Sequence, residues 1–349
     1  MDNSIFSKVI IVVPSFGNGG IAYVVKSYLK TGADFKYICT KSNKSKVLSA
    51  LTTFYAIIKL IVLRVCTSRK ILHIHFSSGT SFSRKRIFII LGKWLGFKVI
   101  GHCHGSEFKQ FAQKVGYERI KSTLGKCDSI IVLSQSWKEY FNDVLGLKTT
   151  AIGNPVCPVK DLSPQSHHEK VELLFMGKIG GRKGIFDLVD VLSHLQDDNK
   201  KKVHLIVGGN GDVEKLEQVI KDCHLEDVIQ FVGWVDNEKK DGYMRTCDVA
   251  VLPSYNEGLP VFLLEALTYG KAVISTTVGG IPEIVKNGIN GYLITAGDKL
   301  ALADAINNYI ENPSLPSQHG LASLDIVKPY YIDEVMKSLE NEYRNCLNK

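Results

Sequence analysis

Short apolar runs alternate with segments of helical length along most of this chain. Runs rich in valine and isoleucine recur at intervals that leave room for a helix between one run and the next. In the first half, strands are predicted at Val9–Val13, Phe35–Cys39, Ile71–Phe76, Lys98–His102, Ser129–Leu133 and Thr149–Ile152. The helices predicted between them lie near Ile21–Leu29, Lys46–Val65, Ser83–Leu95, Phe108–Leu124 and Ser136–Val144. Because buried apolar strands that alternate with helices pack as a parallel sheet covered on both faces, this half is predicted to be a doubly wound α/β domain.

A stretch with three prolines and a polar run, residues 154–169, separates this half from a second series of the same kind. Strands are predicted there at Glu172–Met176, Val203–Val207, Ile229–Val232, Val249–Leu252, Ala272–Ser275 and Gly291–Ile294. The intervening helices are predicted near Ile185–Leu195, Val213–Cys223, Lys239–Arg245, Pro260–Tyr269 and Leu300–Ile310, and a last helix, Ile332–Leu347, follows Pro313, Pro316 and Pro329. We therefore expect a first domain at 1–158, joined by a C-terminal helix from 330–349, and a second domain at 159–329.

Composition and cysteine spacing narrow the class of protein. Apolar residues make up 45% and charged residues 22% of the chain, which is typical of globular proteins and excludes a disordered or fibrous chain. No basic segment followed by an apolar core opens the sequence, and the most apolar stretch, Ala50–Cys66, is interrupted by Lys59 and Arg64. That stretch falls short of the roughly 20 uninterrupted apolar residues of a spanning helix, so a cytoplasmic protein is expected.

None of the 8 cysteines lies in a Cys-x-x-Cys pair, so reduced thiols are expected and a structural zinc site is not. His102-Cys103-His104 is the one run that suggests a metal, but neighbouring residues on a strand point to opposite faces. No metal site is predicted.

The charge is distributed very unevenly along the chain. Residues 1–150 contain 23 lysines and arginines against 7 acids, whereas residues 151–349 contain 20 against 28. Such asymmetry suggests an anionic partner for the first half, although any solvated surface carries some charge. Arg84-Lys85-Arg86 runs into an apolar segment with Trp94, as in a helix that lies on an anionic membrane, and a core helix with a charged first turn is the alternative. Because no nucleic-acid motif is recognisable, a nucleic-acid partner is not expected.

Loops that follow strands of parallel sheets are the usual place for ligands. In the first half, Gly19 and Gly20 precede a predicted helix, where open backbone and a helix N-terminus suit a phosphate, although their spacing does not match the dinucleotide fingerprint. His104 follows the fourth predicted strand and precedes glycine. It is either a hydrogen-bonding or proton-handling group or a packed histidine.

Two loops of the second half carry stronger signals. The loop that contains Lys178 and Lys183 combines three cations with four glycines at the end of a predicted strand, which suits a pyrophosphate, and a solvated basic turn is the alternative. In the segment from Tyr255 to Leu267, Glu257 precedes a helix predicted to begin at Pro260, and Glu265 lies inside its apolar run. A buried acid requires polar partners, so we expect a polar ligand there, close to the backbone amides of Gly258 and Leu259; a purely structural pair of acids is the alternative.

With these motifs, the sequence resembles the retaining glycosyltransferases of family 4. The most specific part of the resemblance is DVAVLPSYNEGLPVFLLEALTYGKAVISTTVGGIPEIVKNGINGYLI, from Asp248 to Ile294, with its Glu-x7-Glu pair. The resemblance implies the GT-B architecture, in which two Rossmann-like domains face each other across a cleft. It also implies a nucleotide-sugar donor used as a substrate, and neither a cofactor nor a metal.

The resemblance further implies roles for single residues. Glu257 and His104 correspond to groups that contact the transferred sugar at the reaction centre, and Glu265 to the acid that binds the ribose. Donor contacts are also implied for Gly19, Gly20, Lys178, Lys183, Gly258 and Leu259. Lys178 departs from the family pattern, which has arginine there, so the planar bidentate fork is lost.

The activity expected from these features is transfer of a UDP- or GDP-linked sugar to a saccharide or lipid-linked acceptor. A role in bacterial surface-polysaccharide synthesis, peripheral to the inner face of the cell membrane, is expected by resemblance. A sugar-nucleotide epimerase of similar shape and a basic nucleic-acid or membrane binding module are the alternatives.

Overall fold

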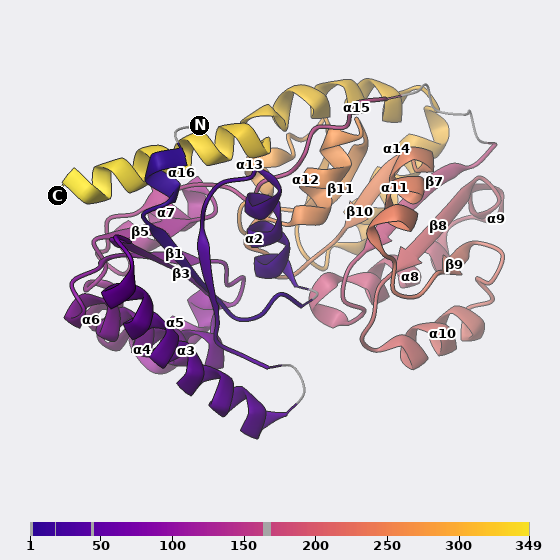
Figure 1. The fold of residues 1–349 in the computed structure, drawn as a ribbon. Coiled ribbons are helices and arrows are strands. Elements are labelled where there is room, and N and C mark those ends of the chain that lie inside the picture. The colour runs from indigo at the N-terminus through magenta and orange to yellow at the C-terminus, as the bar shows by residue number, and fades with distance from the viewer. Residues whose placement is uncertain (1–2, 18, 43–44, 163–168, 349) are drawn as a thin grey trace. The chain divides into compact units, whose positions relative to one another are not determined.

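The computed structural model contains two separate six-stranded sheets (Figure 1). Within each sheet, every pair of neighbouring strands is parallel. The structure describes residues 3–17, 19–42, 45–162 and 169–348. The chain divides into one unit of Met1–Pro155 with Tyr330–Lys349, and a second unit of Val156–Pro329. The expected boundary lay three residues later, at 158, and residues 163–168 of the expected linker lie outside the described part. The predicted α/β class with two doubly wound parallel sheets is confirmed.

The first unit is built on a sheet in the order β2-β1-β3-β4-β5-β6. Its strands are β1 (Val9–Val13), β2 (Lys36–Cys39), β3 (Ile71–Phe76), β4 (Lys98–Cys103), β5 (Ser129–Val132) and β6 (Thr150–Ala151). Its helices are α1 (Asn3–Phe6), α2 (Gly20–Lys30), α3 (Lys46–Cys66), α4 (Thr80–Trp94), α5 (Phe108–Val115), α6 (Tyr117–Leu124), α7 (Gln135–Asp143) and α16 (Ile332–Asn348). Because β1 and β3 are buried along their whole length, their runs of valine and isoleucine are covered on both faces.

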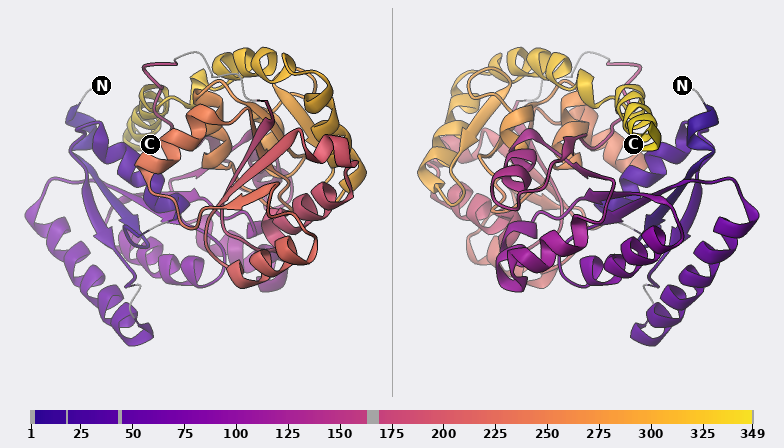
Figure 2. Two further views of the ribbon diagram at one scale, coloured as in Figure 1. Left: turned by 90° about the vertical axis from the view of Figure 1, so that its right-hand side faces the viewer. Right: turned by 90° about the vertical axis from the view of Figure 1, so that its left-hand side faces the viewer.

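Two apolar cores cover the faces of this sheet. One contains Ala56 and Leu60 of α3 with Phe88 of α4, and the other contains Val24 of α2 with Leu339 of α16. Figure 2 shows the C-terminal helix beside the N-terminal one, and the two are in contact. The last helix of the chain therefore completes the first unit.

The second unit has a sheet in the order β12-β11-β10-β7-β8-β9. Its strands are β7 (Val171–Met176), β8 (Val203–Gly208), β9 (Ile229–Phe231), β10 (Val249–Leu252), β11 (Ala272–Thr276) and β12 (Gly291–Ile294). Its helices are α8 (Ile185–His194), α9 (Asp197–Lys200), α10 (Val213–Asp222), α11 (Asn237–Thr246), α12 (Val261–Thr268), α13 (Ile281–Ile284), α14 (Lys299–Glu311) and α15 (Leu315–Ile326), with short 3-10 turns at Gly181–Lys183 and Lys328–Tyr330. This is the strand order of a Rossmann domain.

Two helix predictions were wrong, and one helix was missed. The helix predicted over Phe108–Leu124 is broken in two at Gly116, whose φ of 93° lies in the left-handed region that glycine tolerates. No helix was predicted around Pro316, although this residue lies in the first turn of α15, where proline is accepted. Pro260 is the N-cap of α12 rather than its first residue, so that helix begins at Val261.

Candidate active site

The two acid- and lysine-bearing loops of the second unit meet at one point of its sheet. They follow β7 and β10, the adjacent strands from which the chain winds outward in opposite directions. At such a switch point the two helices that follow the strands lie on opposite faces, which leaves a crevice at the carboxyl ends of the strands. The predicted ligand-binding loops therefore occupy the part of a doubly wound sheet where ligands bind.

Glycine allows the two loops to pack tightly. Gly184 has a φ of 71°, and a Cβ at this position would lie 2.0 Å from the carbonyl oxygen of Pro253. The amide of Tyr255 donates to the carbonyl of Arg182 over 2.9 Å, so the backbones are directly bonded. Residues that are far apart in the sequence, Lys183 and Glu257, are brought together as a consequence.

Glu257 is buried, and three groups surround its Oε1 atom. Nζ of Lys183 donates to it over 2.5 Å, and the hydroxyl of Ser254 donates over 2.9 Å. The guanidinium of Arg182 lies 3.9 Å away and donates to the carbonyl of Asn256 over 2.8 Å. A buried carboxylate is stable only with such partners, and the same cations can neutralise a ligand phosphate.

The turn that begins α13 packs against the backbone around Gly258. Gly279 has a φ of 58°, and a Cβ there would lie 2.0 Å from the carbonyl oxygen of Glu257. The amide of Gly280 donates to the carbonyl of Gly258 over 2.7 Å. Leu259 is buried beside them. The glycine pair therefore fixes the position of the loop that carries Glu257.

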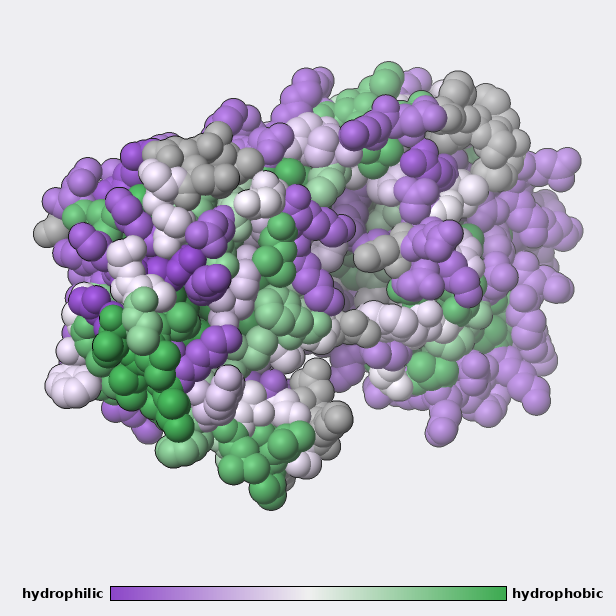
Figure 3. All heavy atoms as spheres, viewed as in Figure 1, coloured by the Kyte–Doolittle hydropathy of each residue, from purple (hydrophilic) through white to green (hydrophobic). Residues whose placement is uncertain are grey.

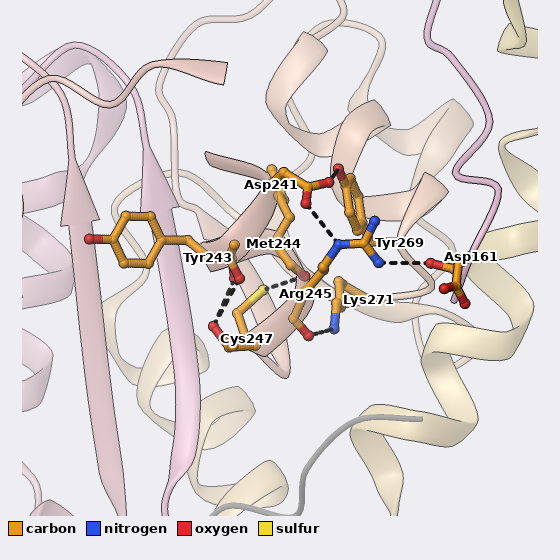
Figure 4. A network of polar contacts seen from close by, with 10 residues as sticks. Asp161, Asp241, Tyr243, Met244, Arg245, Cys247, Tyr269 and Lys271 are labelled. Carbon is orange, nitrogen blue, oxygen red and sulfur yellow. Dashed lines mark hydrogen bonds and ion pairs between the residues drawn. The ribbon is translucent and has the colours of Figure 1, made fainter. Parts of the chain in front are cut away.

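Glu265 is the second acid of the predicted pair, and it forms an ion pair with a different lysine. It lies on α12 and accepts from Nζ of Lys240 on α11 over 2.6 Å. Figure 4 shows what anchors α11: Arg245 and Tyr269 both donate to Asp241, over 2.8 and 2.5 Å. These bonds hold the pKa of Asp241 below its usual value, Arg245 contributing most. Since Tyr269 caps α12, the network fixes the helix that bears the cation against the helix that bears the acid.

Lys178 is not part of this cluster. It is exposed in the loop after β7, and no bond of its side chain is recorded within the described residues. Sequence reasoning missed Ser254 and Lys240. The signal for Ser254 was its position three residues before Glu257, whereas nothing in the sequence pairs Lys240 with Glu265.

In the first unit, Gly19 and Gly20 open α2. Gly19 is the N-cap, and both residues are exposed. A Cβ at either position would meet no atom within 4 Å, and Gly19 has an extended φ of −158°. Internal packing therefore does not explain these glycines. Asn18, within the same loop, lies outside the described residues.

His104 belongs to a group of four packed histidines, in two hydrogen-bonded pairs. His75 Nδ1 lies 2.8 Å from His104 Nε2, and His73 Nε2 lies 3.1 Å from His102 Nδ1. One pair stacks on the other, since ring centroids are 4.3 Å apart for His73 and His75 and 4.1 Å for His102 and His104. The hydroxyl of Tyr343 on α16 is 2.7 Å from His73 Nδ1. His73 and His75 are fully buried, so both are packed residues of the sheet.

The argument from opposite faces was wrong for this run. His102 and His104 are two residues apart, so on a strand they share a face, and His75 pairs with His102 in the β3–β4 register. The ring atoms of His73, His75 and His102 come within 4.8 Å of one another, as in a metal site. Both ring nitrogens of His73, however, already have hydrogen-bond partners in His102 and Tyr343, and Nδ1 of His75 has one in His104, so hydrogen bonds order the array.

Burial keeps the whole array neutral. Desolvation lowers the pKa of His73 and of His104 to about 3, and it lowers the pKa of His75 and His102 well below the usual value of 6.5. A hydrogen bond with Asn154 acts in the opposite direction on the pKa of His104. In this neutral state His104 can form hydrogen bonds but carries no positive charge. Any sugar that contacts its ring nitrogens competes with His75 and Asn154 for them.

The second unit matches a known family. The profile described as "Glycosyl transferases, group 1" matches residues 160–322. An uncharacterised glycosyltransferase of Methanocaldococcus jannaschii is 28% identical over 251 residues, 66% of this chain and 64% of the relative. The amylovoran biosynthesis glycosyltransferase AmsK of Erwinia amylovora is 32% identical over 143 residues, 39% of this chain and 35% of the relative. The chain thus spans less than two thirds of the length of either curated relative.

Similarity of fold extends over nearly all of the chain. The crystal structure of HepE from Anabaena in complex with UDP-glucose superposes with a TM-score of 0.76 at 17% sequence identity, covering 97% of this chain and 99% of that one. At this identity the match establishes the fold, which is GT-B as the sequence predicted.

Proposed function

Because residues 160–322 belong to the group 1 glycosyl transferases, we propose that this chain is a retaining glycosyltransferase that uses a UDP- or GDP-sugar. The observation that carries the proposal is the contact of Lys183 with Glu257 at the switch point of the second sheet. It combines a cation suited to a diphosphate with a carboxylate suited to sugar hydroxyls in one place. The UDP-glucose complex of the structural neighbour HepE makes a nucleotide sugar the first donor to test.

The proposed reaction breaks the bond between the anomeric carbon and the donor phosphate. The acceptor hydroxyl forms its new bond on the same face, and its proton passes to the departing phosphate oxygen. Negative charge grows on the nucleoside diphosphate as it leaves, and preorganised cations stabilise that charge. Lys183 takes this role, with Lys178 as a further candidate, so the proposal requires no metal ion.

The remaining residues have narrower roles. Glu257 contacts the transferred sugar, Glu265 accepts hydrogen bonds from the ribose, and the backbone of Gly258 and Leu259 approaches the donor phosphates. His104 of the first unit supplies a neutral hydrogen-bonding group to the sugar, and Gly19 and Gly20 leave room for the donor beside the start of α2.

For the acceptor, we propose a saccharide or a lipid-linked saccharide in bacterial surface-polysaccharide synthesis. The name of the relative AmsK, which refers to amylovoran biosynthesis, supports this class of product. The corresponding location is cytoplasmic, on the inner face of the cell membrane. The basic first half of the chain, with 23 lysines and arginines against 7 acids, suits that surface.

Donor binding is the direct test. Thermal unfolding of the purified chain is followed with UDP, GDP and a panel of their sugars, because a ligand at one hundred times its Kd stabilises the folded state by about 2.7 kcal/mol. We expect one nucleotide to raise Tm, and the variant Lys183→Met to lose most of that rise. Lys337→Met, which changes a surface lysine of α16, is the matched control. No rise with any nucleotide contradicts the proposal.

Product analysis tests the chemistry. With a suitable acceptor, NMR should show a glycoside with the anomeric configuration of the donor. An inverted product contradicts the retaining mechanism. A changed sugar nucleotide formed without any acceptor indicates an epimerase instead.

A further inference from the structure

Helix α3 turns an apolar stripe away from its own domain. The stripe consists of residues at alternating spacings of four and three along one side of the helix, each between 39% and 80% exposed: Val47, Leu51, Phe54, Ile58, Ile61 and Val65. Leu48, Tyr55 and Val62 extend it sideways and are also exposed. The opposite side holds Ala56 and Leu60, which are fully buried in the core. Figure 3 shows hydrophobic side chains gathered along this helix.

Helix α4 adds to the same kind of surface. Ile87, Ile90 and Trp94 are 46%, 44% and 79% exposed. The C-terminal ends of the two helices are joined by a bond of 2.8 Å from Arg64 Nε to the carbonyl of Leu95. Exposed apolar side chains in this number mark an interaction surface rather than an ordinary exterior. We refer to the α3 stripe and these three α4 residues as the apolar ridge.

The basic triplet on α4 contributes less than the sequence indicated. Lys85 is 1% exposed and donates to the hydroxyl of Thr40 over 2.5 Å, so it is part of the core. Arg84 and Arg86 remain partly exposed. One side of α4 therefore packs in the core, and the other side carries the exposed ridge residues, while its position on a membrane stays a prediction.

The charge of the segment favours an anionic partner for the ridge. From residue 35 to residue 106 the chain contains 13 lysines and arginines and no aspartate or glutamate, and this segment includes all of α3 and α4. Two copies of such a surface repel each other, which disfavours a symmetric dimer. An anionic lipid surface attracts it and also accepts its apolar side chains.

The orientation of α3 follows from its packing. The helix Val47–Cys66 has a mean hydropathy of 1.8 and, by length and composition, could cross a membrane. This corrects the expectation that the stretch is too short. Spanning would, however, expose the core that Ala56 and Leu60 complete, whereas lying in the plane of the interface keeps those contacts and buries only the stripe.

We propose that the apolar ridge inserts into the interfacial region of an anionic membrane, with α3 parallel to the surface. This inference specifies how the protein would bind the membrane surface named in the proposed function, and its biological meaning rests on that function. Lipid binding itself requires no sugar transfer, so the two can fail separately.

Vesicle flotation of the full chain tests the proposal. Vesicles of phosphatidylcholine alone are compared with vesicles that also contain phosphatidylglycerol, with wild type and with the double variant Phe54→Ser, Ile58→Ser. The matched control is Leu300→Ser, Leu321→Ser, which changes two leucines of the second unit that are 80% and 69% exposed. We expect wild type and control to float with anionic vesicles, and the ridge variant to partition at least about tenfold less, because two apolar side chains no longer enter the interface.

Equal flotation of the ridge variant and the control overturns the proposal, as does equal binding to both kinds of vesicle. If sedimentation shows a wild-type dimer without lipid that the ridge variant dissociates, a second copy is the partner instead. A blue shift of Trp94 fluorescence on vesicle binding, absent in Trp94→Phe, is the expected second readout, and circular dichroism checks that each variant is folded. If donor binding persists while flotation fails, only the membrane inference falls.

Discussion

Nζ of Lys183 lies 2.5 Å from Oε1 of Glu257, so a cation suited to the donor diphosphate is bound to the carboxylate suited to the sugar. The two residues are separated by 74 positions and meet only because Gly184 lets their loops touch. Any diphosphate that binds Lys183 therefore competes with Glu257 for the same ammonium group. This competition makes the effect of neutralising the acid predictable.

Glu257→Gln should bind the nucleoside diphosphate more tightly while it transfers sugar more slowly. Removing the negative charge frees Lys183, and we expect Kd to fall about tenfold, or about 1.4 kcal/mol. The transfer rate should fall at least about 100-fold, because the charge at the reaction centre is lost. Isothermal titration and rate measurements on the same preparation check both. Weaker nucleotide binding with unchanged transfer contradicts the assignment.

Two glycine substitutions should separate an effect on stability from an effect on ligand binding. Gly184→Ala puts a side chain on a residue with left-handed backbone, and its Cβ would lie 2.0 Å from the carbonyl oxygen of Pro253. The free energy of unfolding should therefore fall by about 1–3 kcal/mol or more. Gly19→Ala meets nothing within 4 Å and should leave stability unchanged within about 0.5 kcal/mol.

Donor affinity separates the functional interpretation of Gly19 from a neutral one. Urea unfolding measures stability in both variants, and titration with the preferred nucleotide sugar measures binding. We expect Gly19→Ala to bind the donor several times more weakly. Unchanged binding indicates that this glycine is only part of a turn.

Glu265 should account for recognition of the ribose hydroxyls. Wild type is expected to prefer the ribonucleoside diphosphate to its 2′-deoxy analogue by at least about tenfold, because hydrogen bonds to a charged group contribute about 1.5–3 kcal/mol. Glu265→Ala should bind both ligands with similar, weaker affinity. Titration of both ligands into both proteins completes the cycle. A preference that survives in the variant assigns ribose recognition to another residue.

The histidine array should make the first unit sensitive to acid. Its histidines have folded-state pKa values below the unfolded value of 6.5, so the unfolded chain binds protons that the folded chain cannot. Stability should therefore be complete above pH 6.5 and decline below it, down to about pH 3 for His73 and His104. Each histidine contributes a slope of up to about 1.4 kcal/mol per pH unit.

Urea unfolding between pH 7.5 and 5 measures this slope. His75→Asn removes one titrating group and should make the slope smaller by up to about 1.4 kcal/mol per pH unit, whatever its effect on stability at neutral pH. The same slope in wild type and variant contradicts the assignment to the array.

Much of the fold could be predicted from the sequence because buried parallel strands consist of uninterrupted runs of apolar residues. The bounds of Val9–Val13, Ile71–Phe76 and Val249–Leu252 match the prediction to the residue. Breaks that depend on one backbone angle were missed, as at Gly116, since a single glycine also occurs inside helices. The helix that contains Pro316 was missed, although the first turn of a helix accepts proline.

The loops of the candidate site could be predicted from the sequence, but the contacts between them could not. The loops with Lys183 and Glu257 were identified from glycines, cations and an acid beside an apolar run. Their pairing depends on strand order, which places β7 beside β10, and local patterns do not encode that order. The burial of Lys85 and the contact of Lys240 with Glu265 are likewise products of packing between distant segments.

The return of α16 has a consequence for how the protein is made. Tyr343 of this helix reaches His73, and Glu342 accepts from Ser129, so one face of the first sheet is completed by a helix that follows the whole second unit in the chain. The unit of Val156–Pro329 is continuous and can mature as soon as it emerges. The sheet of the first unit must instead wait, with buried histidines and valines uncovered, until α16 has been synthesised. Nascent chains stalled before residue 332 should for this reason be the ones that chaperones retain.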